Sequence, residues 1–298
     1  MKPNQLKSNF LLLSASVIWG FAFVAQRHGM TFIGPLTFNG IRFILGAVTL
    51  IPVMKFLSPS FSFHALLNPV LLLHGAMAGV ALFFASTFQQ VGIIYTSAGN
   101  AGFITSLYII FVPLFGLFLR KPSGKYVWGG VILATGGLYM LSFHEKMQMQ
   151  MGDLLVLISA FFWGMHLIVL SYIAPIHDFR TIAFIQFLFT GIISLSLSLL
   201  FEEPEIQQIQ QATFPILYAG IASAGIGFTL QVAGQRHARA DHAALILGLE
   251  ALFAALGGYL LLSERMSFSA IIGCGLMLAG VTISQIRSTK KGTLKTKD

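Results

Sequence analysis

The chain has 298 residues, of which 56% are hydrophobic and only 9% are charged. Soluble globular proteins carry about 25% charged residues, so this composition excludes a soluble globular domain and indicates a membrane protein. The net charge of +8 does not indicate nucleic-acid binding, because the basic residues fall between the apolar segments and mostly on one side of them.

Ten apolar segments are long enough to cross a bilayer, which requires about 20 residues of helix. In chain order they cover residues 10–27, 36–56, 69–91, 98–119, 125–143, 153–173, 181–201, 213–236, 242–262 and 268–286. Each is expected to be a helix, because backbone polar groups in lipid must be hydrogen-bonded within the segment. The predicted fold is an all-α integral membrane protein with ten transmembrane helices.

Lysine and arginine residues are divided unequally between the two sides that ten crossings define. The side that receives both termini holds fourteen of them, and the other side holds Arg27, Lys146 and Arg265. Cytoplasmic loops carry the excess of positive charge, so both termini of this multi-pass protein are expected on the cytoplasmic side of the cytoplasmic (inner) membrane. Residues 288–298 are predicted to form a basic cytoplasmic tail on anionic lipid.

The second half of the chain repeats the pattern of the first half. The stretch "SASVIWGFAF" around Trp19 is similar to "LISAFFWGMH" around Trp163, 144 positions later. Each half contains five segments, and because five is odd, the second half enters the membrane from the opposite side. The sequence therefore predicts two inverted-topology five-helix repeats, residues 1–147 and 148–287, with a solute site between them at mid-depth. This organisation is typical of transport by alternating access.

The ordered motifs resemble those of the drug/metabolite transporter superfamily, specifically the EamA-like ten-helix transporters. These motifs are "IWGFAF" (18–23), "GIRFILGA" (40–47), "YTSAGNAGFITSLYIIFVPLFGLFL" (95–119), "GDLLVLISAFFWG" (152–164) and "AALILGLEALFAALGGYLLLSERMS" (243–267). The resemblance covers nearly the whole chain. It implies a secondary transporter of small organic metabolites, such as amino acids or related solutes, with export as the direction.

Two charged residues, Arg42 and Glu250, lie well inside the predicted segments. A charge within lipid costs at least about 2.5–3.5 kcal/mol, so such residues face a bundle interior or a wet cavity. Glu250 is predicted to contact substrate or carry a proton, and the alternative is a structural glutamate that fixes helix packing. Arg42 could hold a carboxylate or phosphate, pair with Glu250, or serve only a structural role by reaching the interface or capping carbonyl groups.

Polar and aromatic side chains on other segments complete the predicted substrate site. It comprises Trp19, Gln89, Asn100, Tyr108, Trp163, His166, Gln231 and Glu250, with Glu250 and Arg42 as candidate coupling residues. The two tryptophans are expected to form an aromatic wall, and His166 could relay protons. Each polar residue could instead be a hydrogen-bonding contact between helices. Pro113 is predicted to kink the fourth segment.

Three classes of protein remain compatible with the sequence. A transporter is favoured over a membrane-embedded enzyme or a channel, because the chain has no P-loop, no H-E-x-x-H motif and no signal of an activated serine. No catalytic residue, metal or cofactor is expected. The expected partners are a small-molecule substrate and the lipid bilayer, without nucleic acid, and a homodimer stays open. Proton antiport, facilitated diffusion and solute exchange are all open as modes of coupling.

Overall fold

The computed structural model describes four stretches of the chain. Within these stretches the chain forms helices and no strand. The described residues are 3–57, 66–142, 150–261 and 267–285. Lys146, Arg265 and the predicted tail 288–298 lie outside them. In chain order the helices are α1 (Pro3–Gly29), α2 (Pro35–Leu57), α3 (Pro69–Ile94), α4 (Ala98–Ser106), α5 (Tyr108–Phe118), α6 (Lys125–Ser142), α7 (Met151–Ile173), α8 (Phe179–Phe201), α9 (Ile206–Gln211), α10 (Thr213–Leu217), the π-helix η2 (Tyr218–Phe228), α11 (Thr229–Gln235), α12 (Ala240–Leu247), α13 (Glu250–Leu261) and α14 (Phe268–Gln285).

Nine helical stretches in the described part of the chain are long and apolar enough to cross a membrane. Six are single helices, and three are composed of consecutive helices: α4 with α5, α10 with η2 and α11, and α12 with α13. The predicted all-α membrane fold is confirmed to this extent. The fifth predicted segment forms α6, an 18-residue helix with Lys125 at its start and two pairs of glycines. These residues lower its apolar character, and the tenth crossing stays a prediction.

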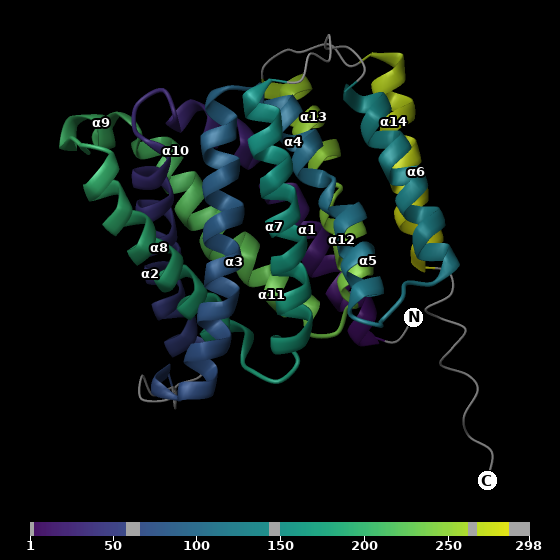
Figure 1. The fold of residues 1–298 in the computed structure, drawn as a ribbon, viewed down its shortest axis with the longest axis horizontal. Helices are drawn as coiled ribbons and strands as arrows, with labels where there is room; N and C mark the ends of the chain where they lie inside the picture. Colours follow the sequence, from purple (N-terminus) through teal and green to yellow (C-terminus); the bar gives the residue numbers. More distant parts are fainter. Residues whose placement is uncertain (1–2, 58–65, 143–149, 262–266, 286–298) are drawn as a thin grey trace.

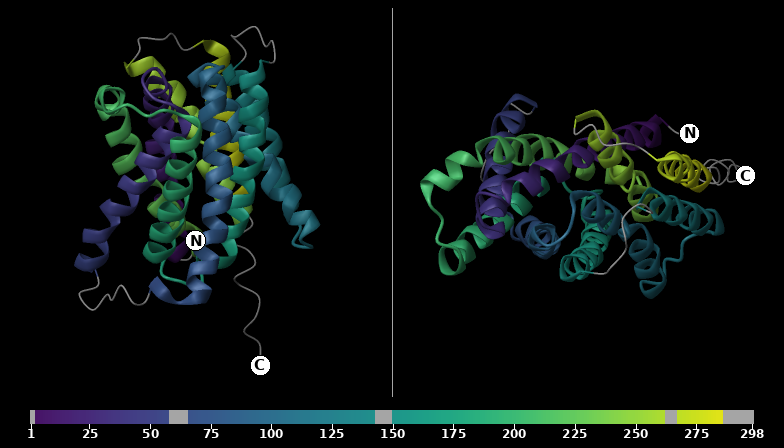
Figure 2. Two further views of the ribbon diagram at one scale, coloured as in Figure 1. Left: turned by 60° about the vertical axis from the view of Figure 1, so that its left-hand side comes forward. Right: turned by 90° about the horizontal axis from the view of Figure 1, so that it is seen from above.

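The long helices run side by side between two ends of the bundle (Figure 1). We call the end at which α1 and α12 begin the lower end, and the end at which α2 and α7 begin the upper end. The most extensive helix contacts join α6 to α14, α3 to α7 and α2 to α8. Figure 2 shows from above that α6 and α14 stand together at one edge, with α2 and α8 toward the opposite edge. The remaining long helices lie between these two pairs.

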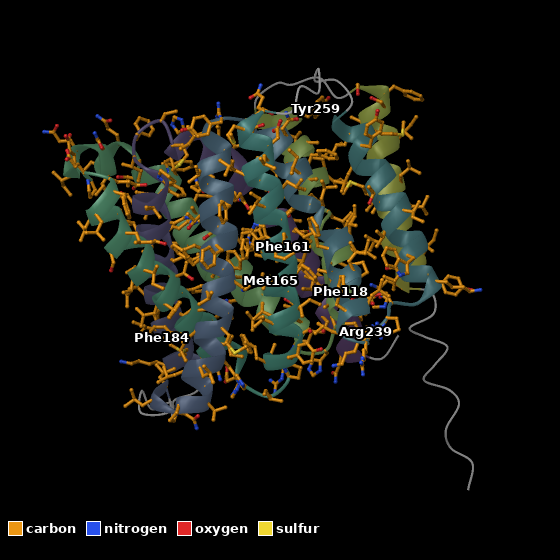
Figure 3. All side chains as sticks on the ribbon, viewed as in Figure 1. Phe118, Phe161, Met165, Phe184, Arg239 and Tyr259 are labelled. Carbon is orange, nitrogen blue, oxygen red and sulfur yellow. The ribbon has the colours of Figure 1, made fainter. Side chains whose placement is uncertain are left out.

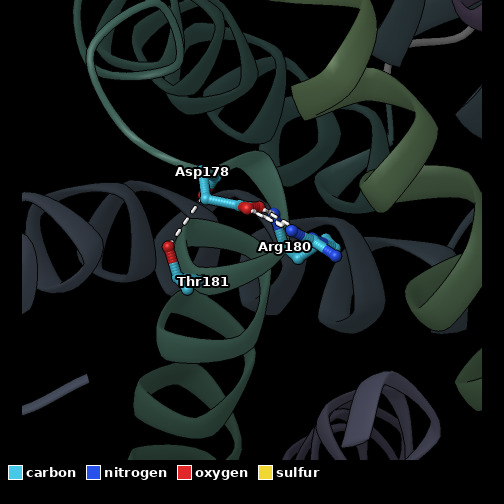
Figure 4. A network of polar contacts seen from close by, with 3 residues as sticks. All are labelled: Asp178, Arg180 and Thr181. Atoms are coloured by element: carbon cyan, nitrogen blue, oxygen red, sulfur yellow. Dashed lines mark hydrogen bonds and ion pairs between the residues drawn. The ribbon is translucent and has the colours of Figure 1, made fainter. Parts of the chain in front are cut away.

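Side chains fix the beginnings of helices at both ends of the bundle. At the lower end, the Asp178 carboxylate accepts a hydrogen bond from the backbone N–H of Arg180 at 2.8 Å, and Thr181 donates its hydroxyl to the Asp178 carbonyl (Figure 4). The side-chain hydrogen bond from Arg180 holds the pKa of the Asp178 carboxyl below its usual value. At the upper end, Glu202 accepts from the N–H of Thr37 at 2.8 Å. Such caps satisfy amides that have no partner within their own helix.

Two of the membrane-crossing stretches are interrupted at matching places in the two halves. The break between α4 and α5 falls at Leu107, and the break between α12 and α13 falls at Gly248 and Leu249. Leu107 and Leu249 are 142 positions apart, the spacing that also relates Gln89 to Gln231. At both breaks the backbone forms i→i+3 turns, with Leu107 N–H bonding Ile104 O at 3.1 Å. The predicted kink residue Pro113 lies inside α5, so the break precedes it by more than a turn.

Candidate substrate site

A cavity lies in the middle of the bundle, between helices from both halves of the chain. It contains about 460 Å³ of space between atoms. Of the residues predicted from the sequence, it is lined by Trp19, Arg42, Gln89, Tyr108, Trp163, Gln231 and Glu250. Apart from Arg42, which α2 supplies, these residues come from α1, α3, α5, α7, α11 and α13. Thr105 on α4 also lines the cavity.

The two helix breaks place Tyr108 and Glu250 at the cavity. Tyr108 is the first residue of α5 and Glu250 is the first residue of α13, so each directly follows a break. Because a break changes the direction of the helix, it turns these first residues toward the centre of the bundle. The two residues are also 142 positions apart and are therefore equivalent in the predicted repeat.

Glu250 is a buried carboxylate without a counter-ion. Its side chain is only 4% exposed, and its Oε1 atom has no hydrogen-bond partner among the described residues. Tyr108 is close enough to interact with this carboxyl group, but the Tyr108 hydroxyl also has no partner in hydrogen-bonding geometry. Leaving a buried polar group unpaired costs about 1–3 kcal/mol, and more for a charged group. This arrangement leaves the carboxylate available to a ligand.

Arg42 is a buried cation that is equally without a counter-ion. Its side chain is 3% exposed, and its Nη1 atom donates to Oε1 of Gln26 at 2.9 Å, whereas Nε has no hydrogen-bond partner among the described residues. Its guanidinium lies 4.7 Å from the centre of the Phe43 ring. Both Arg42 and Glu250 lie in the described chain, and no ion pair joins them. The pairing of these two residues that the sequence allowed is therefore not formed here.

A chain of amide hydrogen bonds connects Arg42 to the aromatic wall. Gln26 Oε1 accepts from Arg42 and also from Gln89 Nε2 at 3.2 Å, and Gln89 Oε1 accepts from the indole N–H of Trp163 at 2.6 Å. Gln231 also faces the cavity, where its Oε1 atom has no partner. The sequence spacing places Gln26 on one face of the first segment with Trp19, although Gln26 is not among the eight residues predicted for the site.

Phe228 joins the two tryptophans into one aromatic wall. Its ring centre lies 4.6 Å from that of Trp19 and 5.6 Å from that of Trp163. The Trp19 indole also donates to the carbonyl oxygen of Ser223 at 3.2 Å, and it lies so close to Gly227 that a Cβ atom there would be 2.6 Å from Trp19 Nε1. Phe228 and Ser223 belong to η2, and π-helical turns occur frequently at functional sites. Phe228 was not among the residues predicted from the sequence.

Two predicted residues do not line the cavity. His166 is fully buried one shell away, where Nε2 lies 2.9 Å from Gln186 Oε1 and the ring packs edge-on against Trp163. Asn100 lies in the first turn of α4, where its backbone N–H bonds the capping Ser97 hydroxyl at 3.0 Å. No cluster of three His, Cys, Asp or Glu side chains within the described stretches could hold a metal ion.

Polar contacts join α1, α3 and α7 at the upper end of the bundle. The guanidinium of Arg27 donates to the backbone carbonyl oxygens of Ile93 and Thr96. The Thr96 hydroxyl in turn donates to Asp153 Oδ1 at 2.5 Å, in the first turn of α7. These contacts hold the upper ends of three cavity-lining helices together.

A bundle of membrane-crossing helices around a buried polar cavity defines a multi-pass membrane protein with an internal site. The chain belongs to the EamA-like transporter family, whose sequence profile matches residues 6–143 and 150–285. The predicted membership of the drug/metabolite transporter superfamily is thereby confirmed. The protein is a membrane transporter by family.

Relatives with similar sequences extend over nearly the full chain. An uncharacterized transporter of Archaeoglobus fulgidus is 28% identical over 285 residues, which cover 95% of this chain and 87% of the relative. The uncharacterized transporter YoaV of Bacillus subtilis is 23% identical over 94% of this chain and 97% of its own. A protein of known crystal structure, 17% identical, superposes with a TM-score of 0.78 over 97% of this chain and all of that chain. At that identity the superposition shows a shared fold.

Proposed function

We propose that this protein is a secondary transporter that exports small zwitterionic metabolites, such as amino acids or related solutes, across the cytoplasmic membrane. The observation that carries the proposal is the pair of buried ionisable side chains on one cavity, the basic Arg42 and the acidic Glu250, each without a counter-ion among the described residues. A zwitterion supplies the missing counter-ion to each, its carboxylate to Arg42 and its ammonium group to Glu250. The wall formed by Trp19, Phe228 and Trp163 takes the apolar part of the solute.

The protein moves its substrate by alternating access between two inverted repeats, residues 1–147 and 148–287, with α6 as the tenth crossing. The helix contacts support the inverted repeat, because the extensive contacts that a helix of one half makes with the other half are matched by contacts of the equivalent helix. Helix α3 packs on α7, the first helix of the other half, and α11 with η2 packs on α1 in the same way. The pairs α2 with α8 and α6 with α14 join equivalent helices directly. The matching breaks at Leu107 and Leu249 agree with the same relation.

The conformation described is closed at its upper end, where Arg27 and Asp153 tie α1, α3 and α7 together. The lower end carries the excess of positive charge that is typical of cytoplasmic loops, which supports an orientation with the lower end in the cytoplasm and the upper end outside the cell. Export then begins with solute entry from the lower end, and release requires that these upper contacts break. Transport by this route needs no catalytic residue, which favours a carrier over a membrane-embedded enzyme.

Counterflow in proteoliposomes tests the proposal. Vesicles that contain the purified protein and are preloaded with millimolar unlabelled leucine are expected to accumulate trace external labelled leucine transiently, well above vesicles loaded with buffer alone. A carrier gives this result because each outward trip returns a site that can bind labelled solute on the inward trip. Label recovered in a chemically altered product would indicate an enzyme instead. Voltage-driven currents far above carrier rates, without counterflow, would indicate a channel.

A further inference from the structure

A second cavity opens at the lower end of the bundle, and we call it the vestibule. It lies among the end of α5, the end of α7 and the turn between α11 and α12, and contains about 1130 Å³ of space between atoms. Its walls carry three cationic side chains, a histidine and one carboxylate. These are Lys121, Arg236, Arg239, His237 and Asp241. Figure 3 shows Arg239 at this end of the bundle. The vestibule therefore has an excess of positive charge.

The single carboxylate of the vestibule is already engaged. Asp241 accepts hydrogen bonds from Arg239 Nη2 at 2.8 Å and Nε at 3.1 Å, and from the Ser123 hydroxyl at 2.8 Å. The hydrogen bond with Asp241 raises the pKa of the Arg239 guanidinium, and the opposite charges of this ion pair neutralise each other. Neither Lys121 nor Arg236 forms an ion pair with a residue in the described stretches. Asp178, the other carboxylate near Arg236, is already paired with Arg180, so Lys121 and Arg236 are the source of the excess positive charge.

The backbone presents Lys121 and the start of α12 to the same space. Arg120 adopts a left-handed conformation with φ of 54°, and the N–H of Lys121 bonds the Gly116 carbonyl at 2.8 Å, which ends α5 and turns the chain into the vestibule. The Lys121 ammonium lies 4.2 Å from the centre of the Tyr172 ring. Helix α12 begins at Ala240 with no side-chain cap from Arg239. The N–H of His242 donates to Asp241 Oδ1 at 2.9 Å, so the amides of Ala240 and Asp241 are the ones that present the positive end of the helix dipole to this region.

We propose that the vestibule is an oxyanion-binding site, in which Lys121, Arg236 and the first amides of α12 hold a phosphate or carboxylate group. The group belongs either to the headgroup of an anionic lipid or to a soluble anion that enters from the cytoplasm. Charge-assisted hydrogen bonds from a lysine, an arginine and helix N-terminal amides are the contacts that such groups prefer. The inference concerns a site separate from the central cavity and does not depend on which solute the central cavity carries.

The test uses full-length protein in neutral detergent and two probes. In native mass spectrometry, an equal mixture of phosphatidylglycerol and phosphatidylcholine with the same acyl chains reports preference for an anionic headgroup. In thermal unfolding, inorganic phosphate reports a soluble anion. The test variant is Lys121→Gln with Arg236→Gln, and the matched control is Lys7→Gln with Lys55→Gln, which removes two exposed charges from the same end outside the vestibule. Arg239 stays unchanged because its pair with Asp241 holds the turn before α12.

We expect the test variant to bind one of the two probes at least about tenfold more weakly than wild type and control, since two charge-assisted contacts are lost. Preference for phosphatidylglycerol identifies a lipid headgroup, and a stabilisation by phosphate without lipid preference identifies a soluble anion. The single variants Lys121→Gln and Arg236→Gln should each lose part of the affinity. They keep the proposal testable if the double variant fails to fold. Equal loss in test and control variants, or no binding of either probe by wild type, would overturn the proposal.

Discussion

Replacement of Glu250 by glutamine is expected to weaken zwitterion binding and transport by about tenfold to a hundredfold, while the folded protein becomes no less stable. The amide keeps the shape of the side chain but cannot pair with an ammonium group, and hydrogen bonds to charged groups are worth about 1.5–3 kcal/mol. The unpaired carboxylate itself is a burden on the folded state, because burial takes it out of water without a partner. Its removal should therefore leave the unfolding temperature unchanged or raise it.

This opposition between activity and stability distinguishes a binding role from a packing role. Glu203→Gln, at an exposed carboxyl in the loop after α8, is the matched control and should change neither quantity. If Glu250 only fixes helix packing, Glu250→Gln should lower the unfolding temperature and transport together. The same variant also tests proton coupling, since pH dependence of residual transport that matches wild type would discard Glu250 as a proton carrier.

The neighbouring glycines 136 and 137 of α6 should respond to alanine with opposite signs. A Cβ atom at Gly137 would lie 2.5 Å from the carbonyl oxygen of Gly273 on α14, whereas a Cβ atom at Gly136 would meet nothing within 4 Å. Overpacking of this kind typically costs about 1–3 kcal/mol, while alanine gains up to about 1 kcal/mol over glycine in an open helix position. Gly137→Ala should thus lower the unfolding temperature, and Gly136→Ala should keep or raise it.

Thermal unfolding of the two purified variants in the same detergent checks this prediction. The structural reason is that α6 and α14 approach closely at two levels, since a Cβ atom at Gly130 would lie 2.6 Å from the carbonyl oxygen of Gly280. Equal effects of the two substitutions would contradict the close contact of α6 with α14. A strong effect would support α6 as an integral part of the membrane bundle.

The sequence predicts the apolar segments well because lipid imposes a length and a hydrophobicity on each of them. It is less informative where tertiary packing decides. The break before Tyr108 falls at Leu107, a residue that favours helices, whereas the predicted kink residue, Pro113, lies inside α5. The repeat could have indicated the break, because Leu107 is equivalent to Leu249, next to Gly248. The break is therefore visible in one half of the sequence and hidden in the other.

In the candidate site, too, the residues whose positions depend on tertiary packing are the ones that the sequence does not reveal. Charged and aromatic residues inside apolar segments, such as Glu250 and Trp163, attract notice because burial of such groups needs a reason. Phe228 attracts none in a chain that contains 28 phenylalanines, and its position depends on the π-helix η2 and on the absence of a side chain at Gly227. Asn100 has a suitable polar side chain, but the cap at Ser97 sets it near the upper end of α4, away from the cavity.

The most direct test of the account compares ligands that keep one apolar group and differ only in charge. Binding of leucine, 3-methylbutylamine and 4-methylpentanoate to the purified protein can be measured by isothermal titration calorimetry. Because Arg42 and Glu250 each lack a counter-ion, the account predicts that leucine binds at least about tenfold more tightly than either singly charged analogue. Equal or tighter binding of one analogue would contradict recognition of both charges in the central cavity.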